Sequence, residues 1–220
     1  GLRRALPIVL GYLPVGFAFG VLAVKNNIPP SLAVAMSVLM FSGSGQFVFA
    51  GMWGAGAGAF SIIAAVFIVN LRYLLQSAAE SPWLAGLPRA QRFLLGLGLT
   101  DETFAVHITA FQNGWQRSLT TLFVCNHTAQ LGWVGGAAIG AFCGEMVTDV
   151  KPLGLDYALT AMFLALLVPQ CVSRLHVLVA IVTAILSLSL KLAGMGQWNV
   201  VVATVLGATL GVILLHRNKS

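Results

Sequence analysis

Two adjacent acids, Asp101 and Glu102, lie inside an otherwise apolar stretch that runs from Leu94 to Val106. If this stretch spans a membrane, the carboxyl groups lie near the bilayer centre, where a charge costs roughly 2.5 kcal/mol or more. They should then face protein or water, and either could bind a substrate ammonium group or carry a proton. The alternative is a loop at the membrane interface, where acids cost little.

A second polar interruption consists of Ser42, Gly43, Ser44, Gly45 and Gln46. Serine and glycine are poorer helix formers than the apolar residues around them, so the pattern predicts an unwound stretch inside a membrane helix. Backbone groups freed there must bond within the protein or face a water-filled cavity. The N–H groups at the end of a half-helix suit a substrate carboxylate. A kink or a polar helix contact is the alternative.

Three more polar side chains join the candidates. Arg72 could pair with one of the acids or clamp a substrate carboxylate, or it could extend to the membrane surface. Asn70 lies two residues before it and is included in the expected substrate site. His127 is a candidate proton carrier beside Asp101 and Glu102, although a lone histidine is more often a packing residue.

The elements that hold these residues are predicted to be membrane helices. The chain has 220 residues, of which 58% are hydrophobic and 8% charged, whereas a soluble domain carries about 25% charged residues. Residues 5–24 and 26–71 contain no Lys, Arg, Asp or Glu. A spanning helix needs about 20 apolar residues, so the second run is long enough for two spans.

The composition therefore predicts an all-α integral membrane protein, a polytopic helical bundle forming a single transmembrane domain over residues 1–220. We expect about seven to eight spanning segments. The apolar runs are residues 5–24, 31–53, 57–79, 93–112, 118–143, 155–173, 174–191 and 197–215. Polar residues interrupt the second and fourth runs, and the count falls to seven if one of these is re-entrant.

Glycines mark the expected helix contacts. One run contains four glycines at four-residue spacing, namely Gly132, Gly136, Gly140 and Gly144. This spacing keeps small residues on one helix face, where another backbone can come close. Gly16 and Gly20 repeat the device in the first run. The stripe is either a sliding interface or ordinary helix packing.

Several function classes are disfavoured. The net charge is +6, but the cations lie singly at the ends of apolar runs, so they indicate topology rather than nucleic-acid binding. The sequence contains no HExxH, GxSxG or P-loop motif, so we expect neither an enzyme nor use of ATP by this chain alone. Three cysteines without metal-ligand spacing predict no metal and no cofactor.

Five stretches, in this order, resemble the AzlC family, the large subunits of bacterial branched-chain amino acid exporters. They are Leu13–Gly20, Phe41–Phe47, Asn70–Arg72, Thr100–Ala105 and Leu155–Phe163. The resemblance implies export of valine, leucine and isoleucine, with methionine as a further candidate. It also implies a multi-pass location in the bacterial inner membrane and a small, separately encoded AzlD-type subunit.

The expected mechanism is proton-driven antiport by alternating access. The substrate carboxylate would meet residues 42–46 and Arg72, and the ammonium group would meet Asp101 or Glu102. Protons would pass through the two acids. The alternatives are a channel-like or structural subunit of a membrane complex, a transporter of another small solute, and an intramembrane enzyme that uses His127.

Overall fold

The fold was analysed in a computed structural model. It describes residues 1–112, 118–144, 146, 157, 164, 167–168, 171, 173–195 and 198–217. Its chain contacts divide into two compact units, residues 1–160 and 161–220. The expected segment 155–173 lies almost entirely outside the described residues. Every element in the described part of the chain is helical.

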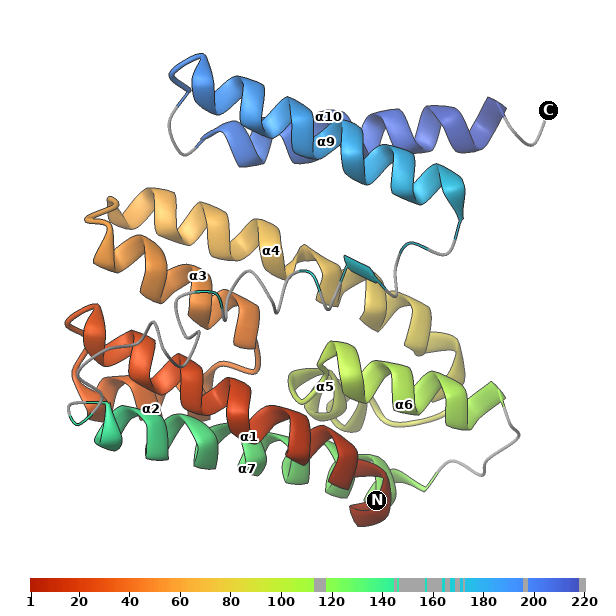
Figure 1. The fold of residues 1–220 in the computed structure, drawn as a ribbon. Helices are drawn as coiled ribbons and strands as arrows, with labels where there is room; N and C mark the ends of the chain where they lie inside the picture. The colour runs from red at the N-terminus through yellow and green to blue at the C-terminus, as the bar shows by residue number, and fades with distance from the viewer. Residues whose placement is uncertain are drawn as a thin grey trace. The chain divides into compact units, whose positions relative to one another are not determined.

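The first unit contains three long helices with shorter ones between them (Figure 1). The long helices are α1 (Leu2–Lys25), α4 (Ala59–Glu80) and α7 (Leu119–Cys143). The shorter ones are α2 (Pro30–Leu39), α3 (Gly43–Gly54), α5 (Arg89–Leu97) and α6 (Asp101–Gln112), and the 3-10 turn Ser81–Leu84 follows α4. Pro30 occupies the first position of α2 because its fixed φ suits a helix start and its missing N–H is not needed there.

Three of the described helices are long and apolar enough to cross a membrane. They are Leu2–Lys25, Ala59–Leu84 and Arg174–Leu192. Their outer faces carry large exposed apolar side chains such as Leu10, Leu74 and Ile185, which a lipid environment would cover. An all-helical fold with three candidate membrane spans is thus confirmed for the described residues, while the count of seven to eight stays a prediction.

Both polar interruptions are real breaks between helices. The run 31–53 divides into α2 and α3 with Met40–Ser42 outside either helix, and the run 93–112 divides into α5 and α6 at Gly98–Thr100. The prediction that residues 43–46 are unwound was wrong, since they form the first turn of α3. Ser42 caps this turn by accepting a hydrogen bond from the Gly45 N–H at 3.1 Å, which places the break just before the glycines.

The glycine stripe is the contact between α1 and α7, which run side by side (Figure 1). A Cβ on Gly16 would lie 2.7 Å from the Trp133 carbonyl oxygen. A Cβ on Gly140 would overlap the carbonyl oxygen of Phe17, so the two backbones touch. Gly20 of α1 lies in the same way against the backbone of α7, and Gly136 of α7 lies against the backbone of α1. Close packing of backbones replaces the hydrophobic drive that lipid does not supply.

Replacing Gly140 with alanine should lower the free energy of unfolding by about 1–3 kcal/mol, because the added methyl group must push the two backbones apart. Gly135 is the matched control, since nothing lies within 4 Å of a Cβ there. Gly135→Ala should leave stability unchanged or raise it slightly. Thermal unfolding of the purified chain in detergent compares the two. Equal unfolding temperatures would contradict the proposed importance of this contact.

The second unit contains α9 (Arg174–Leu192) and α10 (Trp198–Arg217), which pack against each other. Small residues again allow a close approach, because Gly207 of α10 lies against Thr183 of α9. The Asn199 side chain donates hydrogen bonds to the backbone and side-chain oxygens of Ser187 at 3.1 and 3.2 Å. This hairpin carries none of the residues expected to bind substrate.

Candidate functional site

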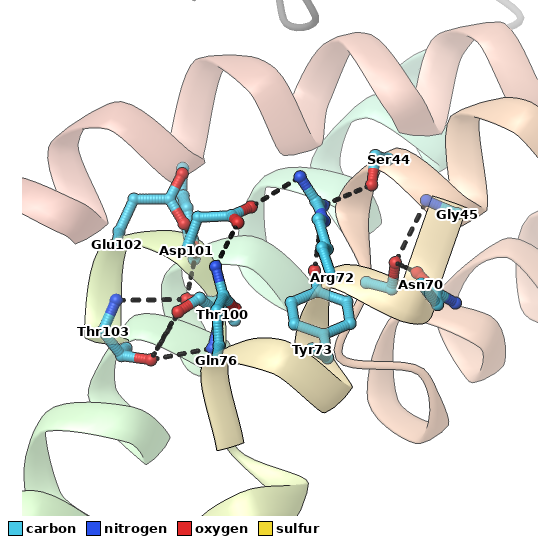
Figure 2. Close-up of polar contacts among 12 residues, drawn as sticks. Ser44, Gly45, Asn70, Arg72, Tyr73, Gln76, Thr100, Asp101, Glu102 and Thr103 are labelled. Atoms are coloured by element: carbon cyan, nitrogen blue, oxygen red, sulfur yellow. Dashed lines mark hydrogen bonds and ion pairs between the residues drawn. The ribbon is translucent and has the colours of Figure 1, made fainter. Parts of the chain in front are cut away.

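Arg72 of α4 lies at the centre of a polar cluster between the two helix breaks. Its Nη1 pairs with Asp101 Oδ2 at 2.8 Å, and its Nη2 donates to Ser44 Oγ at 2.5 Å. Figure 2 shows the guanidinium group extended between Asp101 on one side and Ser44 on the other. The side chains of Arg72 and Asp101 are 22% and 18% exposed. One cation thus links α3, α4 and α6 and remains partly open.

Asp101 is held through both carboxylate oxygens. The second oxygen, Oδ1, accepts a hydrogen bond from Gln76 Nε2 at 2.7 Å. Asp101 is the first residue of α6, and the N-terminus of a helix favours a negative charge. Its placement therefore stabilises the carboxylate in an otherwise apolar segment.

Glu102 points to a different helix from its neighbour. Its Oε2 lies 2.5 Å from the Tyr12 hydroxyl of α1, which also lies 2.8 Å from Thr100 Oγ1. The start of α6 is fixed by reciprocal bonds: the Thr103 hydroxyl accepts from the Thr100 N–H at 2.8 Å, and the Thr100 hydroxyl accepts from the Thr103 N–H at 3.3 Å. Because successive helix residues point about 100° apart, the two acids meet different partners.

Ser42 and Asn70 join the first break to α4. The Ser42 hydroxyl donates to Asn70 Oδ1 at 2.5 Å while it caps α3. A Cβ on Gly45 would lie 3.2 Å from Asn70 Nδ2 and 2.6 Å from Met40 Cε, so the glycine permits this close approach. Figure 2 shows this group beside the Arg72 cluster, with Asn70 and Arg72 both on α4.

Gln46 and Gly43 instead face Trp133 of α7. Gln46 is fully buried, and its Nε2 donates to the carbonyls of Met36 and Met40 at 2.9 and 3.0 Å. Its Oε1 accepts from Trp133 Nε1 at 2.9 Å. A Cβ on Gly43 would lie 2.6 Å from the Trp133 ring. Both residues therefore hold the break in place, and Gln46 has no polar atom left for a substrate.

His127 lies apart from the cluster. Its side chain is exposed on α7, and Nδ1 contacts the Phe123 carbonyl of the same helix at 2.9 Å. No hydrogen bond or ion pair between described residues joins His127 to Arg72, Asp101 or Glu102. The structure therefore does not bring the expected proton carrier to the two acids. No three His, Cys, Asp or Glu side chains gather as a metal site within the described residues.

The sequence analysis missed a buried pair on the same two helices. Glu80 Oε1 of α4 lies 2.7 Å from His107 Nδ1 of α6, and these side chains are only 6% and 2% exposed. One signal was available, because Arg72, Gln76 and Glu80 recur every four residues and so share one helix face. The partner on α6 could not be read from that spacing.

Comparison with known proteins places this site in a family. The sequence model of the AzlC protein family matches residues 7–147, which include every residue of the Arg72 cluster. This chain belongs to the AzlC family. The resemblance seen in the sequence motifs is thereby confirmed for most of the chain.

Two relatives that match nearly the whole length of this chain are named as membrane proteins. It is 32% identical over 216 residues to an uncharacterized membrane protein of Archaeoglobus fulgidus, covering 96% of this chain and 92% of that protein. It is 30% identical over 220 residues to the inner membrane protein YgaZ of Escherichia coli, covering 97% and 87%.

A third relative has a name that states a transport role. The branched-chain amino acid transport protein AzlC of Bacillus subtilis is 32% identical over 173 residues, which cover 75% of this chain and 64% of that protein. No solved structure matches this chain. The family model and these relatives show that the chain is an AzlC-family membrane protein related to a branched-chain amino acid transport protein.

Proposed function

We propose that this chain is a secondary transporter that exports valine, leucine and isoleucine, with methionine as a further candidate, across the cytoplasmic (inner) membrane in exchange for protons. A small AzlD-type membrane subunit works with it. One observation carries the proposal: Arg72 and Asp101 form a partly exposed ion pair beside two helix breaks. A zwitterionic substrate needs such a cation and anion side by side.

Binding would exchange one set of ion pairs for another. The substrate carboxylate takes the place of Asp101 on the Arg72 guanidinium, beside Ser44. The substrate ammonium group then pairs with Asp101, or with Glu102 nearby. Every charge keeps a partner, which matters because an unpaired charge in a low-dielectric region costs several kcal/mol. Asn70, Ser42, Ser44 and Gly45 line the same region, whereas Gly43 faces Trp133.

Proton coupling is assigned to the acids of this cluster. A proton on Asp101 would remove the negative charge that the substrate ammonium group needs, so the proton and the substrate compete for this acid, as exchange requires. Glu102, bonded to Tyr12, is the second candidate. His127 is left out of the proposed site, because its exposed position and bond to its own helix give it no contact with these groups.

An apolar hollow supports the choice of substrate side chain. It has a volume of about 450 Å³ and lies between α3 and α4. Its walls are Met40, Phe49, Trp53, Ala59, Ile62, Ile63, Val66 and Phe67. Met40 belongs to the first helix break, whose Ser42 bonds Asn70. An aliphatic side chain attached to a zwitterion held at Arg72 is the chemistry that this lining favours.

Inside-out membrane vesicles test the function. They are prepared from cells that express the full chain together with a small AzlD-type subunit, and an imposed pH gradient drives uptake of labelled leucine. We expect saturable uptake that valine and isoleucine compete with and lysine does not. Vesicles with the small subunit alone are the control. Non-saturable uptake would indicate a channel, and uptake independent of the gradient would contradict proton exchange.

A further inference from the structure

One face of α4 forms a ladder of polar contacts with α6. Arg72 and Gln76 both bond Asp101, and Glu80 pairs with His107 one step further along the helix. Eight residues of α-helix span about 12 Å, so the ladder has two separate ends. Arg72 marks the end at the proposed substrate site, and Glu80 marks the other.

Side chains of α5, α6 and α7 lie around the Glu80–His107 pair. Residue Glu80 is 4% exposed and His107 is 2% exposed. The Cys125 thiol of α7 lies beside the imidazole, and the Phe111 ring of α6 lies 6.3 Å from it between ring centres. The charged groups contributed by α5 are Arg89 and Arg92, which share a hollow with Glu80.

Several buried polar atoms of the ladder lack a hydrogen bond of ordinary geometry, although the Cys125 thiol lies beside the His107 ring. Arg72 Nε, Gln76 Oε1 and His107 Nε2 are buried and make no hydrogen bond of ordinary geometry within the described residues. A buried polar atom without a partner costs roughly 1–3 kcal/mol, so such atoms normally meet water or a ligand. The ladder therefore has places for water at both ends.

Glu80 also reaches an opening. It lines a hollow of about 460 Å³ together with Ser77, Ser81, Arg89 and Arg92. The rest of its lining is apolar, namely Leu84, Phe93, Gly96 and Leu97. Water occupies about 30 Å³ per molecule in the liquid, so a hollow of this size has room for several beside the polar side chains. Glu80 is the one carboxylate among the lining residues, and its other contact is a buried histidine.

We propose that the Glu80–His107 pair is a second proton-binding site, filled from this hollow, whose proton is exchanged for the substrate. One proton moves from water to the pair and back, and no other bond forms or breaks. With the proton bound, imidazolium and carboxylate cancel each other. Without it, a single buried negative charge remains, which a low-dielectric region disfavours. The inference rests on the proposed export function.

Coupling to the substrate follows from the shared helices. Substrate binding breaks the Arg72–Asp101 pair, and proton release weakens the Glu80–His107 pair, so both change the contact between α4 and α6. Because both events loosen the contact between α4 and α6, substrate binding favours proton release, and proton release favours substrate binding to the same degree.

The first test separates substrate movement from proton use in the vesicle system. Glu80→Gln and His107→Gln should still exchange labelled for unlabelled leucine at equal pH, but lose uptake driven by a pH gradient. Glu80→Asp should recover part of the driven uptake. His176→Gln, an exposed histidine on α9, is the matched control and should keep both. Loss of exchange in a variant that elutes as folded protein, or retention of driven uptake, would overturn the proposal.

The second test does not depend on leucine. Infrared difference spectra of the purified full chain, recorded across a pH series, should contain an imidazole band that disappears in His107→Gln and a carboxylate band that disappears in Glu80→Gln, because the loss of the imidazolium proton changes the hydrogen bond to Glu80. Bands unchanged by both substitutions would overturn the proton site. If wild-type vesicles move no leucine while the bands are present and the carboxylate band is lost in Glu80→Gln, the export function fails and the proton site stands.

Discussion

Replacing Arg72 with glutamine should lower leucine transport by roughly 100-fold. The guanidinium makes the ion pair to Asp101 at 2.8 Å and the bond to Ser44 at 2.5 Å, and we propose that it takes the substrate carboxylate. A hydrogen bond to a charged group contributes about 1.5–3 kcal/mol. Since 1.4 kcal/mol corresponds to a factor of ten, the loss of one such bond at its upper range gives the expected factor.

A charge-balanced double variant separates binding from structure. Arg72→Gln alone leaves Asp101 without its cation, which destabilises the protein whatever Arg72 does for transport. Arg72→Gln combined with Asp101→Asn removes both charges and should restore folding, as measured by thermal unfolding in detergent. Transport should stay low because the substrate has lost the Arg72 cation and also the Asp101 carboxylate proposed for its ammonium group. Restored transport would show that Arg72 serves only to neutralise Asp101.

Two further variants complete this comparison. Arg72→Lys keeps the charge but cannot present two nitrogens to Asp101 and Ser44 at once, so it should retain an intermediate rate. Arg174→Gln, at the exposed start of α9, removes a cation outside the cluster and should transport like the wild type. Uptake is measured in the inside-out vesicles under the same pH gradient.

Replacing Gln46 with leucine should lower the free energy of unfolding by roughly 3–5 kcal/mol. The substitution keeps a similar side-chain size but leaves the Met40 carbonyl and the Trp133 indole N–H without this partner. The Met36 carbonyl loses one of its two bonds and keeps the one from the Met40 N–H. Each buried polar group left without a partner costs roughly 1–3 kcal/mol. Trp133 also packs on Phe19 and Phe47, so its displacement would disturb the contact of α3 with α1 and α7.

Gln112→Leu is the matched control for this substitution. Gln112 ends α6 and is exposed, so the same chemical change there should leave the unfolding temperature unchanged or nearly so. Thermal unfolding of the two purified variants in detergent gives the comparison. If Gln46→Leu unfolds at the wild-type temperature, the bonds of Gln46 do not hold the first helix break in place.

The positions of the candidate residues explain why Gln46 and Arg72 have different expected effects. Gln46 comes from a polar interruption and Arg72 from near the end of the apolar run 57–79, and both were expected at a substrate site. Arg72 and its partner Asp101 keep part of their surface open, whereas Gln46 is fully buried and its side chain is fully bonded. Burial and hydrogen-bond saturation thus separate a residue available to a substrate from one that holds the fold.

The amino-acid sequence by itself determined the membrane setting, the two helix breaks, the glycine contact and the family. These features depend on composition or on spacing along one segment: apolar length sets a span, and glycines every four residues set one helix face. The position of the first break was off by a few residues, because the Ser42 cap starts α3 at Gly43.

Only the tertiary structure decided which of these residues meet. Arg72 could have paired with either acid, and the register between α4 and α6 selected Asp101 while Glu102 turned to Tyr12 of α1. The Glu80–His107 pair joins residues 27 positions apart, and His127 stayed on an exposed face. Such contacts depend on how one helix is rotated and shifted against another, and local spacing carries no information about that.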